Sequence, residues 1–313
     1  MNRIFHIAVF LLLGAVGVAC IRKDLVMENN IVDVTLSVEG DLDEDKSLFR
    51  GLVWDLDAEK VVTTVFVEPG TSKVTIPAGH SGFVVHSFGC EATYIADEAS
   101  FGIIAATTNE ADGITQELWS TALENSRTLL PSERSLLKTE RVRWEPDRMW
   151  AGTYSGMLPH RGEGERLELE VVARPLFIER VVILDDVQGM EYLASVEAFV
   201  TGCASGRSLV DDKLIGECAI RVPMYRYEGG LIASYVSFGD TYDTTVPRRL
   251  MVVATDTGGR KFLSTYDLSR SFIGTKVMEC LSNLAFEQPP IPEGGGLQPT
   301  LQDWFDVLTP VEI

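Results

Sequence analysis

The sequence predicts an all-β protein with two β-sandwich domains in tandem. Apolar and polar residues alternate along most of the chain, and this period of two is the pattern of strands that bury one face. Glycine, proline, aspartate and serine break the pattern at the short intervals that are typical of a sandwich. A chain of 313 residues is long enough for two domains of ordinary size.

In the first half, most of the expected elements are strands. Residues 31–38 alternate cleanly between apolar and polar side chains, and residues 60–67 are rich in β-branched side chains. The other strands expected here are 74–76, 82–88 and 101–107.

One helix is expected after these strands. It covers residues 114–125, where Ile114, Leu118 and Ala122 recur on one face. The region 126–165 that follows is rich in proline and glycine, which predicts a loop-rich connection.

The second half returns to strands. A long segment, 166–184, is interrupted by Pro175, which removes a ladder donor and therefore belongs at an edge or a bend. Residues 256–259 carry the signal of a hairpin turn. Further strands are expected at 192–200, 217–224, 231–238, 250–255, 261–266 and 276–286.

The amino terminus has the layout of a bacterial lipoprotein signal peptide. Arg3 supplies a positive charge, residues 4–18 are almost entirely apolar, and small residues precede Cys20. The apolar run is shorter than the ~20 residues that a membrane-spanning helix needs. We therefore expect cleavage before Cys20 and attachment of lipid to its thiol. The alternative is an ordinary secretory signal followed by a chance cysteine.

These features divide the chain into five parts. The expected boundaries are 1–19 for the signal peptide, 20–28 for a lipidated tether, 29–164 for the N-terminal sandwich, 165–287 for the C-terminal sandwich, and 288–313 for a Gly/Pro-rich tail with a final strand. The tail has two interpretations: it is a strand that completes the second domain, with Trp304 in the core, or it is a donor strand that contacts a partner.

The chain is strongly acidic. Its formal net charge is −19, while its hydrophobic fraction of 45% and its charged fraction of 23% are those of a globular protein. An acidic surface repels nucleic acid and anionic lipid headgroups, so nucleic-acid binding and electrostatic attachment to a membrane are disfavoured. The membrane partner is then reached through the lipid on Cys20.

Four cysteines follow Cys20 in the sequence: Cys90, Cys203, Cys218 and Cys280. Cys203 and Cys218 are expected on neighbouring strands, where an oxidising compartment would permit a disulfide bond between them. The alternative is that they are buried free thiols. The sequence has no C-x-x-C motif, so neither a zinc ribbon nor a redox motif is indicated.

No catalytic motif is present in the sequence. His86 and Cys90 are the nearest candidates for a base and a nucleophile, but a strand histidine without a catalytic role is the simpler interpretation. The acidic run 41–45 lacks the spacing of a calcium-binding loop and is expected to be solvated. We therefore expect no enzyme activity, no cofactor and no metal site.

Four short features occur in order over essentially the whole mature chain. They are the charged stretch 22–25 after Cys20, VTIPAG at 74–79, RPL at 174–176 together with VQGMEY at 187–192, and GGGLQP at 294–299 followed by Asp303 and Trp304. With these features the sequence resembles the fimbrillin-like lipoproteins of Bacteroidetes-type bacteria, a domain family of unassigned function related to fimbrial subunits and anchors.

The resemblance implies two transthyretin-like Greek-key sandwich domains and a lipid-anchored location on the outer membrane, facing the cell exterior. It also implies kinship with fimbrial subunits, which polymerise by strand exchange after an arginine-specific protease trims an amino-terminal strand. Arg50–Gly51 is a candidate for such a cut, which an anchor would escape. The family supplies no catalytic residues.

The expected function is that of a non-enzymatic surface lipoprotein: a fimbrial anchor or accessory subunit, or an adhesin, that acts through β-strand and loop contacts. The alternative is a glycan-binding surface lipoprotein of a polysaccharide-uptake system. Trp144 and Trp150, which fall in the loop-rich region, are its candidate ligand contacts. A hydrolase would instead need a cleft with convergent carboxylates or a histidine-based dyad.

Overall fold

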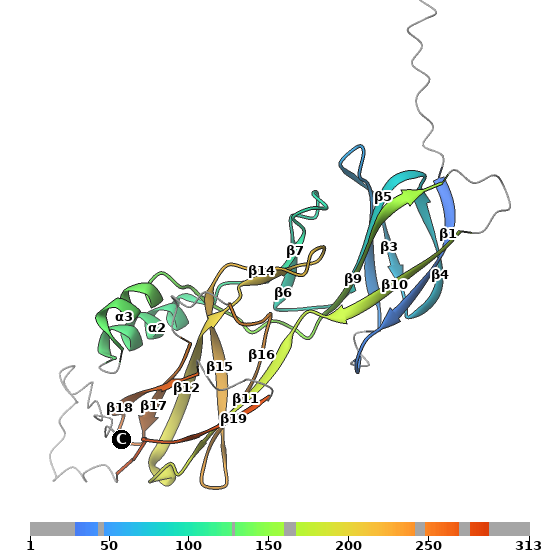
Figure 1. Ribbon diagram of the computed structural model, residues 1–313. Coiled ribbons are helices and arrows are strands. Elements are labelled where there is room, and N and C mark those ends of the chain that lie inside the picture. Colours follow the sequence, from blue (N-terminus) through green and yellow to red (C-terminus); the bar gives the residue numbers. More distant parts are fainter. Residues whose placement is uncertain are drawn as a thin grey trace, which may run out of the picture.

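The computed structural model describes residues 29–42, 47–126, 129–159, 167–241, 248–268 and 276–287. Within these ranges the chain is almost entirely β-structure, which confirms the predicted fold class (Figure 1). The elements of the first half are β1 (Asn29–Val38), β2 (Phe49–Asp55), β3 (Lys60–Val67), β4 (Gly70–Pro77), β5 (Gly79–Ser87), β6 (Thr93–Ala96), β7 (Ala105–Thr108), α2 (Gly113–Asn125), α3 (Pro131–Leu137), β8 (Val142–Arg143), β9 (Trp150–Leu158) and β10 (Leu167–Pro175).

The second half contains the remaining strands and one short helical turn. A 3-10 turn, η2 (Met190–Tyr192), precedes the longest of these strands. The strands are β11 (Ile178–Asp185), β12 (Leu193–Cys203), β13 (Gly206–Ser208), β14 (Leu214–Ile215), β15 (Cys218–Tyr227), β16 (Gly230–Ser237), β17 (Arg249–Asp256), β18 (Lys261–Asp267) and β19 (Val277–Leu281).

The first sandwich is a seven-stranded sheet that folds over on itself, with the strand order β3-β2-β5-β9-β10-β1-β4. The sheet bends between β9 and β10, which pair only at Trp150–Pro175 and Ala151–Arg174. The strands β3-β2-β5-β9 therefore face β10-β1-β4 across a core. Pro175 occupies this corner, as expected of a proline that cannot donate to a ladder.

The core of the first sandwich is filled from both faces. Phe49, Val53 and Phe83 come from one face, and Val34 and Val171 come from the other. Gly51 leaves room for the Phe83 side chain, because a Cβ at this position would lie 2.8 Å from the Phe83 ring.

The second sandwich repeats this arrangement, with the strand order β18-β17-β12-β15-β16-β11-β19. Here one strand passes from one face to the other. The first part of β15, through Pro223, pairs with β12, and the part from Met224 onward pairs with β16. The core lies between the two faces and includes Val200, Ile220 and Tyr235.

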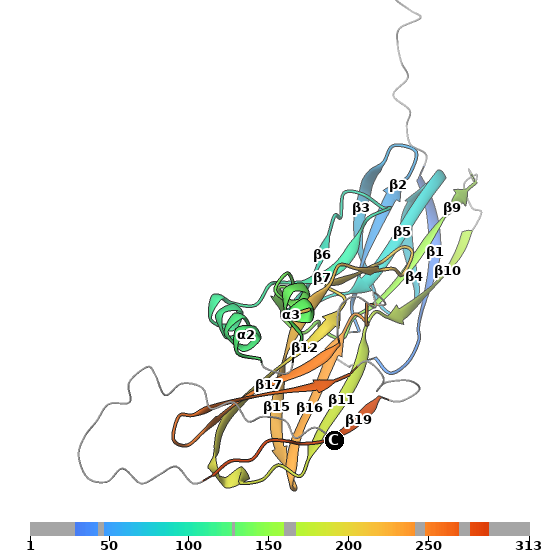
Figure 2. The same ribbon diagram turned by 60° about the vertical axis from the view of Figure 1, so that its left-hand side comes forward.

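A third, four-stranded sheet joins the two halves of the chain. Its order is β14-β13-β7-β6, so the hairpin β6–β7 from the first half pairs with the hairpin β13–β14 from the second. Gly206 and Ser208 of β13 lie opposite Thr107 and Ala105 of β7. Figures 1 and 2 show this small sheet between the two sandwiches.

The expected helix is present as α2, and of its predicted face Ala122 is buried and Leu118 packs on the same cluster, whereas Ile114 does not. Ile114 is 82% exposed, whereas Trp119 and Leu123 are buried against Phe199 and Met251 of the second sandwich. Asp112 caps the helix by accepting a hydrogen bond from the backbone NH of Thr115 at 2.7 Å.

The expected boundary at 164/165 separates β10 from the sheet to which it belongs. β10 pairs with β1 along residues 167–173 and with β9 at its end, so sheet membership places the change of domain between Pro175 and Ile178. The segment from α2 to β8 also departs from a simple tandem, because it leaves the first sandwich and packs on the second.

Candidate functional site: the joint between the sandwiches and the open strand edges

The two sandwiches share an apolar joint. Leu52 and Trp54 of β2 and Val84 of β5 point away from the core of the first sandwich and are almost completely buried. They belong to one hydrophobic cluster with Leu209 and Phe238 of the second half. Because β2 is buried on both faces, its sequence lacks the alternation of a half-exposed strand, which is why it was not predicted.

Backbone and side-chain hydrogen bonds cross the joint. The backbone NH of Leu209 donates to the carbonyl oxygen of Ile104 at 3.1 Å. The hydroxyl of Thr107 donates to the carbonyl oxygen of Ser205 at 2.8 Å. An apolar cluster with directional bonds across it fixes the orientation of the two bodies.

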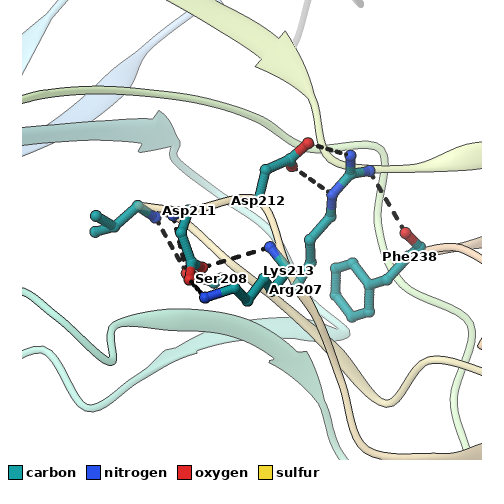
Figure 3. Close-up of polar contacts among 7 residues, drawn as sticks. Arg207, Ser208, Asp211, Asp212, Lys213 and Phe238 are labelled. Carbon is teal, nitrogen blue, oxygen red and sulfur yellow. Dashed lines mark hydrogen bonds and ion pairs between the residues drawn. The ribbon is translucent and has the colours of Figure 1, made fainter.

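The loop of the β13–β14 hairpin is held by charged side chains (Figure 3). The guanidinium of Arg207 donates to both carboxylate oxygens of Asp212, at 2.6 and 2.8 Å, and reaches the carbonyl oxygen of Phe238 at 3.5 Å. Hydrogen bonds from Lys213 and Ser208 lower the pKa of Asp211 to about 2. Asp212 has a φ of 61°, a conformation that aspartate tolerates better than most residues.

A buried ionic group lies beyond the hairpin, at the end of β16. Asp240 forms ion pairs with Arg180, at 3.2 Å, and with Arg248, at 2.5 Å. Nearby, burial is the main cause that raises the pKa of Glu140 to about 8, and the charge of Glu217 adds to it. Glu140 is therefore protonated at neutral pH.

Edge strand β3 is the least protected open edge of the first sandwich. In the described residues it pairs only with β2, and residues 61–67 contain no charge and no proline. Natural sheets usually block such edges with charged residues. Phe66 on this strand is 56% exposed and meets Phe88, 45% exposed, at 5.1 Å between ring centroids. The uncharged edge and this aromatic pair form a surface suited to strand and loop contacts.

Trp150 is a core residue, which corrects the expectation that it contacts a ligand. It is 2% exposed, its indole NH donates to the carbonyl oxygen of Glu39 at 3.1 Å, and Phe177 packs edge-on against it at 5.0 Å. No face of this indole is open to a sugar.

Trp144 lies on the second sandwich, apart from Trp150. It is half-buried beside α2, and the guanidinium carbon of Arg221 lies 5.5 Å from its ring centroid. Bidentate hydrogen bonds to Glu197, both at 2.8 Å, fix that guanidinium. Within the described residues the two tryptophans therefore do not form the exposed pair that glycan binding would need.

The two remaining candidates, His86 and Arg50, both lie within paired strands. His86 is buried in β5, its Nδ1 lies 3.0 Å from the carbonyl oxygen of Ser87, and burial lowers the pKa of its imidazole. Arg50 lies inside β2, paired on both sides, and its guanidinium binds the carboxylate of Glu98. A protease would have to open the sheet to cut after Arg50, so this peptide bond is not the accessible site that the resemblance suggested.

Cys203 and Cys218 lie opposite each other on β12 and β15, and their thiols are not bonded to each other in the structure. Cys20 and Trp304 lie outside the described residues. Across the described ranges, no group of three or more histidine, cysteine, aspartate or glutamate side chains is placed to hold a metal ion. The same ranges contain no helix that is long and apolar enough to cross a membrane.

The comparisons with known proteins give a fold. No protein-family model and no curated protein matches the sequence. A structure from Bacteroides ovatus, described as a candidate adhesin, superimposes with a TM-score of 0.61 at 15% identity, over 86% of this chain and 95% of that one. The two proteins therefore share the two-domain sandwich fold along nearly their full lengths.

Two other solved structures are less similar. The fimbrial anchor protein Mfa2 of Porphyromonas gingivalis has a TM-score of 0.46 at 11% identity, over 80% of this chain and 88% of that one. A Bacteroides thetaiotaomicron structure, described as a candidate polysaccharide-binding protein, has a TM-score of 0.45 at 10% identity, over 74% and 79%.

Proposed function

We propose that this chain is a non-enzymatic surface lipoprotein, a fimbrial anchor or accessory subunit or an adhesin, that presents two rigidly joined sandwiches outside the cell. The observation that carries the proposal is the two-domain fold shared with the Bacteroides ovatus candidate adhesin. The sequence before β1 supports it, because a lipoprotein signal ending at Cys20 would place a lipid anchor directly ahead of the first strand.

The lipid anchor and the outward location are tested together in a Bacteroidetes-type host. Cells expressing the wild-type chain or Cys20→Ala are grown with an alkyne-tagged fatty acid, fractionated, and treated intact with proteinase K. The wild-type chain should carry the tag, sediment with the outer membrane and be digested on intact cells. The Cys20→Ala chain should be untagged and soluble. Lipid tagging of the variant, or protection of the wild-type chain on intact cells, would contradict the proposal.

The contact surface that the proposal predicts is the edge of β3 with the Phe66–Phe88 pair. Its lack of charge allows a partner strand to approach, and two exposed rings offer apolar area to that partner. Phe66→Lys places a charge on the outward face of this edge, whereas Thr75→Lys places one at an exposed position of the other edge strand, β4.

The two lysine variants are compared by co-purification with fimbrial subunits after crosslinking on cells that express fimbriae. We expect Phe66→Lys to reduce the recovered subunits at least tenfold and Thr75→Lys to leave them near the wild-type amount. Equal recovery with both variants would exclude the β3 edge as the contact, and absence of fimbrial subunits from the wild-type sample would exclude the fimbrial role.

A further inference from the structure

Two cysteines face each other at the point where the β13–β14 hairpin leaves the second sandwich. Cys203 ends β12 and Cys218 begins β15, and the two are register partners just past an irregularity of the antiparallel ladder between Val200 and Cys203. Both side chains are 1% exposed and belong to the same core cluster, so they lie on the same face of the sheet. The thiol of Cys203 lies 3.9 Å from the carbonyl oxygen of Val200.

The backbone geometry of such a pair suits a disulfide bond. Directly opposed residues of an antiparallel ladder have Cα atoms roughly 4.5–5.5 Å apart, and disulfides span Cα separations of roughly 4.4–6.8 Å. Cys203 is also bridged to Asp240 on its other side, which fixes its backbone between two neighbours.

From this geometry we propose that Cys203 and Cys218 form a disulfide bond that closes the base of the hairpin docked on the first sandwich. Each thiol loses its hydrogen, the two sulfur atoms join, and a small-molecule disulfide or a disulfide oxidoreductase takes up the two electrons and two protons as a pair of thiols. An extracytoplasmic compartment supplies oxidants of this class.

The bond forms before folding is complete. Burial raises the pKa of Cys203 well above its usual value and that of Cys218 to about 12, so the folded thiols are almost never thiolates. The thiolate is the species that attacks a disulfide. Because both side chains are also 1% exposed in the folded chain, we expect oxidation to occur while β12 and β15 are pairing, and the finished core then to protect the bond.

The crosslink acts on the joint rather than on the second sandwich alone. The chain between the two cysteines contains β13 and β14, and β13 pairs with β7 of the first half. Joining the two ends of this segment restricts the hairpin that carries Leu209 into the shared apolar cluster. Loss of the bond should loosen the joint and leave the cores of both sandwiches closed.

The bond is detected in the full chain, refolded from the reduced state in a mixture of reduced and oxidised glutathione. The product is dissolved in guanidinium with N-ethylmaleimide and digested with trypsin without a reductant. Cleavage at Arg180, Arg207, Lys213 and Arg221 separates the two cysteines into different peptides, residues 181–207 and 214–221. The proposal predicts that these peptides are recovered as one species that dithiothreitol separates. Recovery of both peptides with N-ethylmaleimide on their cysteines would overturn the proposal, as would linkage of either to Cys90 or Cys280.

A second measurement follows the joint. Cys218→Ser should increase amide hydrogen exchange in residues 206–215 at least tenfold under native, oxidised conditions, and Cys280→Ser should not change it. Equal exchange in the wild-type chain and Cys218→Ser would refute the restriction of the hairpin. Both measurements use purified protein, so they are independent of the proposed surface function.

Discussion

Replacing Phe238 with alanine tests whether the two sandwiches behave as one body. Phe238 follows β16, is 1% exposed, and lies in the apolar cluster that contains Leu52 and Trp54 of the first sandwich. Truncation of a buried phenylalanine to alanine costs about 3–5 kcal/mol, from lost apolar transfer and from the cavity left behind. The carbonyl oxygen that Arg207 reaches is retained in the variant, so the lost unfolding free energy reports the removal of the Phe238 ring alone.

The matched control is Phe262→Ala. Phe262 is 4% exposed and packs edge-on against Phe286 at 5.1 Å, inside the core of the second sandwich. We expect both variants to lose about 3–5 kcal/mol of unfolding free energy in urea. Only Phe238→Ala should also open the joint, because its cavity lies between the two bodies.

Hydrogen exchange distinguishes these two effects. In Phe238→Ala, peptides that cover 204–214 and 101–108 should exchange at least tenfold faster than in the wild-type chain, because the bond from Leu209 to Ile104 lies within them. In Phe262→Ala their exchange should stay near the wild-type rate. A loss below about 1 kcal/mol for Phe238→Ala, or equal opening of the joint in the control, would refute the rigid joint.

Two further predictions concern buried side chains. Glu140 has a folded-state pKa of about 8 against an ordinary value of 4.5, so its protonated form stabilises the fold at low pH. That contribution falls by about 1.4 kcal/mol per pH unit as the pH rises between these values. Glu140→Gln should therefore be more stable than the wild-type chain at pH 8 and have a flatter profile in urea unfolding between pH 5 and 8; a parallel profile would contradict the assignment. Trp150→Ala should cost about 3–5 kcal/mol, whereas Trp144→Ala, on the half-buried ring under Arg221, should cost clearly less; equal losses would mean that Trp144 also belongs to a core.

Strands that alternate between apolar and polar residues could be predicted from the sequence, and so could two strands that are buried on both faces, β5 and β17. β3 was predicted with its observed bounds, and the two strands on either side of Pro175 were predicted from the alternation and from that proline. β2 could not be predicted in this way, because the joint covers its outer face and removes the alternation. β9 was hidden by its glycines, at positions 152 and 156, which resemble a loop signal.

The tertiary partners of α2 and β7 could not be predicted from local sequence patterns. Trp119 packs on Phe199, which is far away in the sequence, and this contact turns α2 so that Ile114 faces solvent. Leu118 and Ala122 of the predicted face do pack on the second sandwich, but the spacing of apolar residues in 113–125 wrongly adds Ile114 to that face. The pairing of β7 with β13 could not be predicted either, because the choice of partner strand depends on tertiary contacts.

The position of β1 has a mechanical consequence. β1 is the first described strand after the expected tether, and it lies inside the sheet, parallel to β10 on one side and antiparallel to β4 on the other. Ladder hydrogen bonds run perpendicular or slanted to the strands. Under the proposed lipid anchor, a pull along the axis of β1 would load both ladders in shear, so that many bonds resist together. An edge strand pulled away from one end would lose its ladder hydrogen bonds one at a time under the same force.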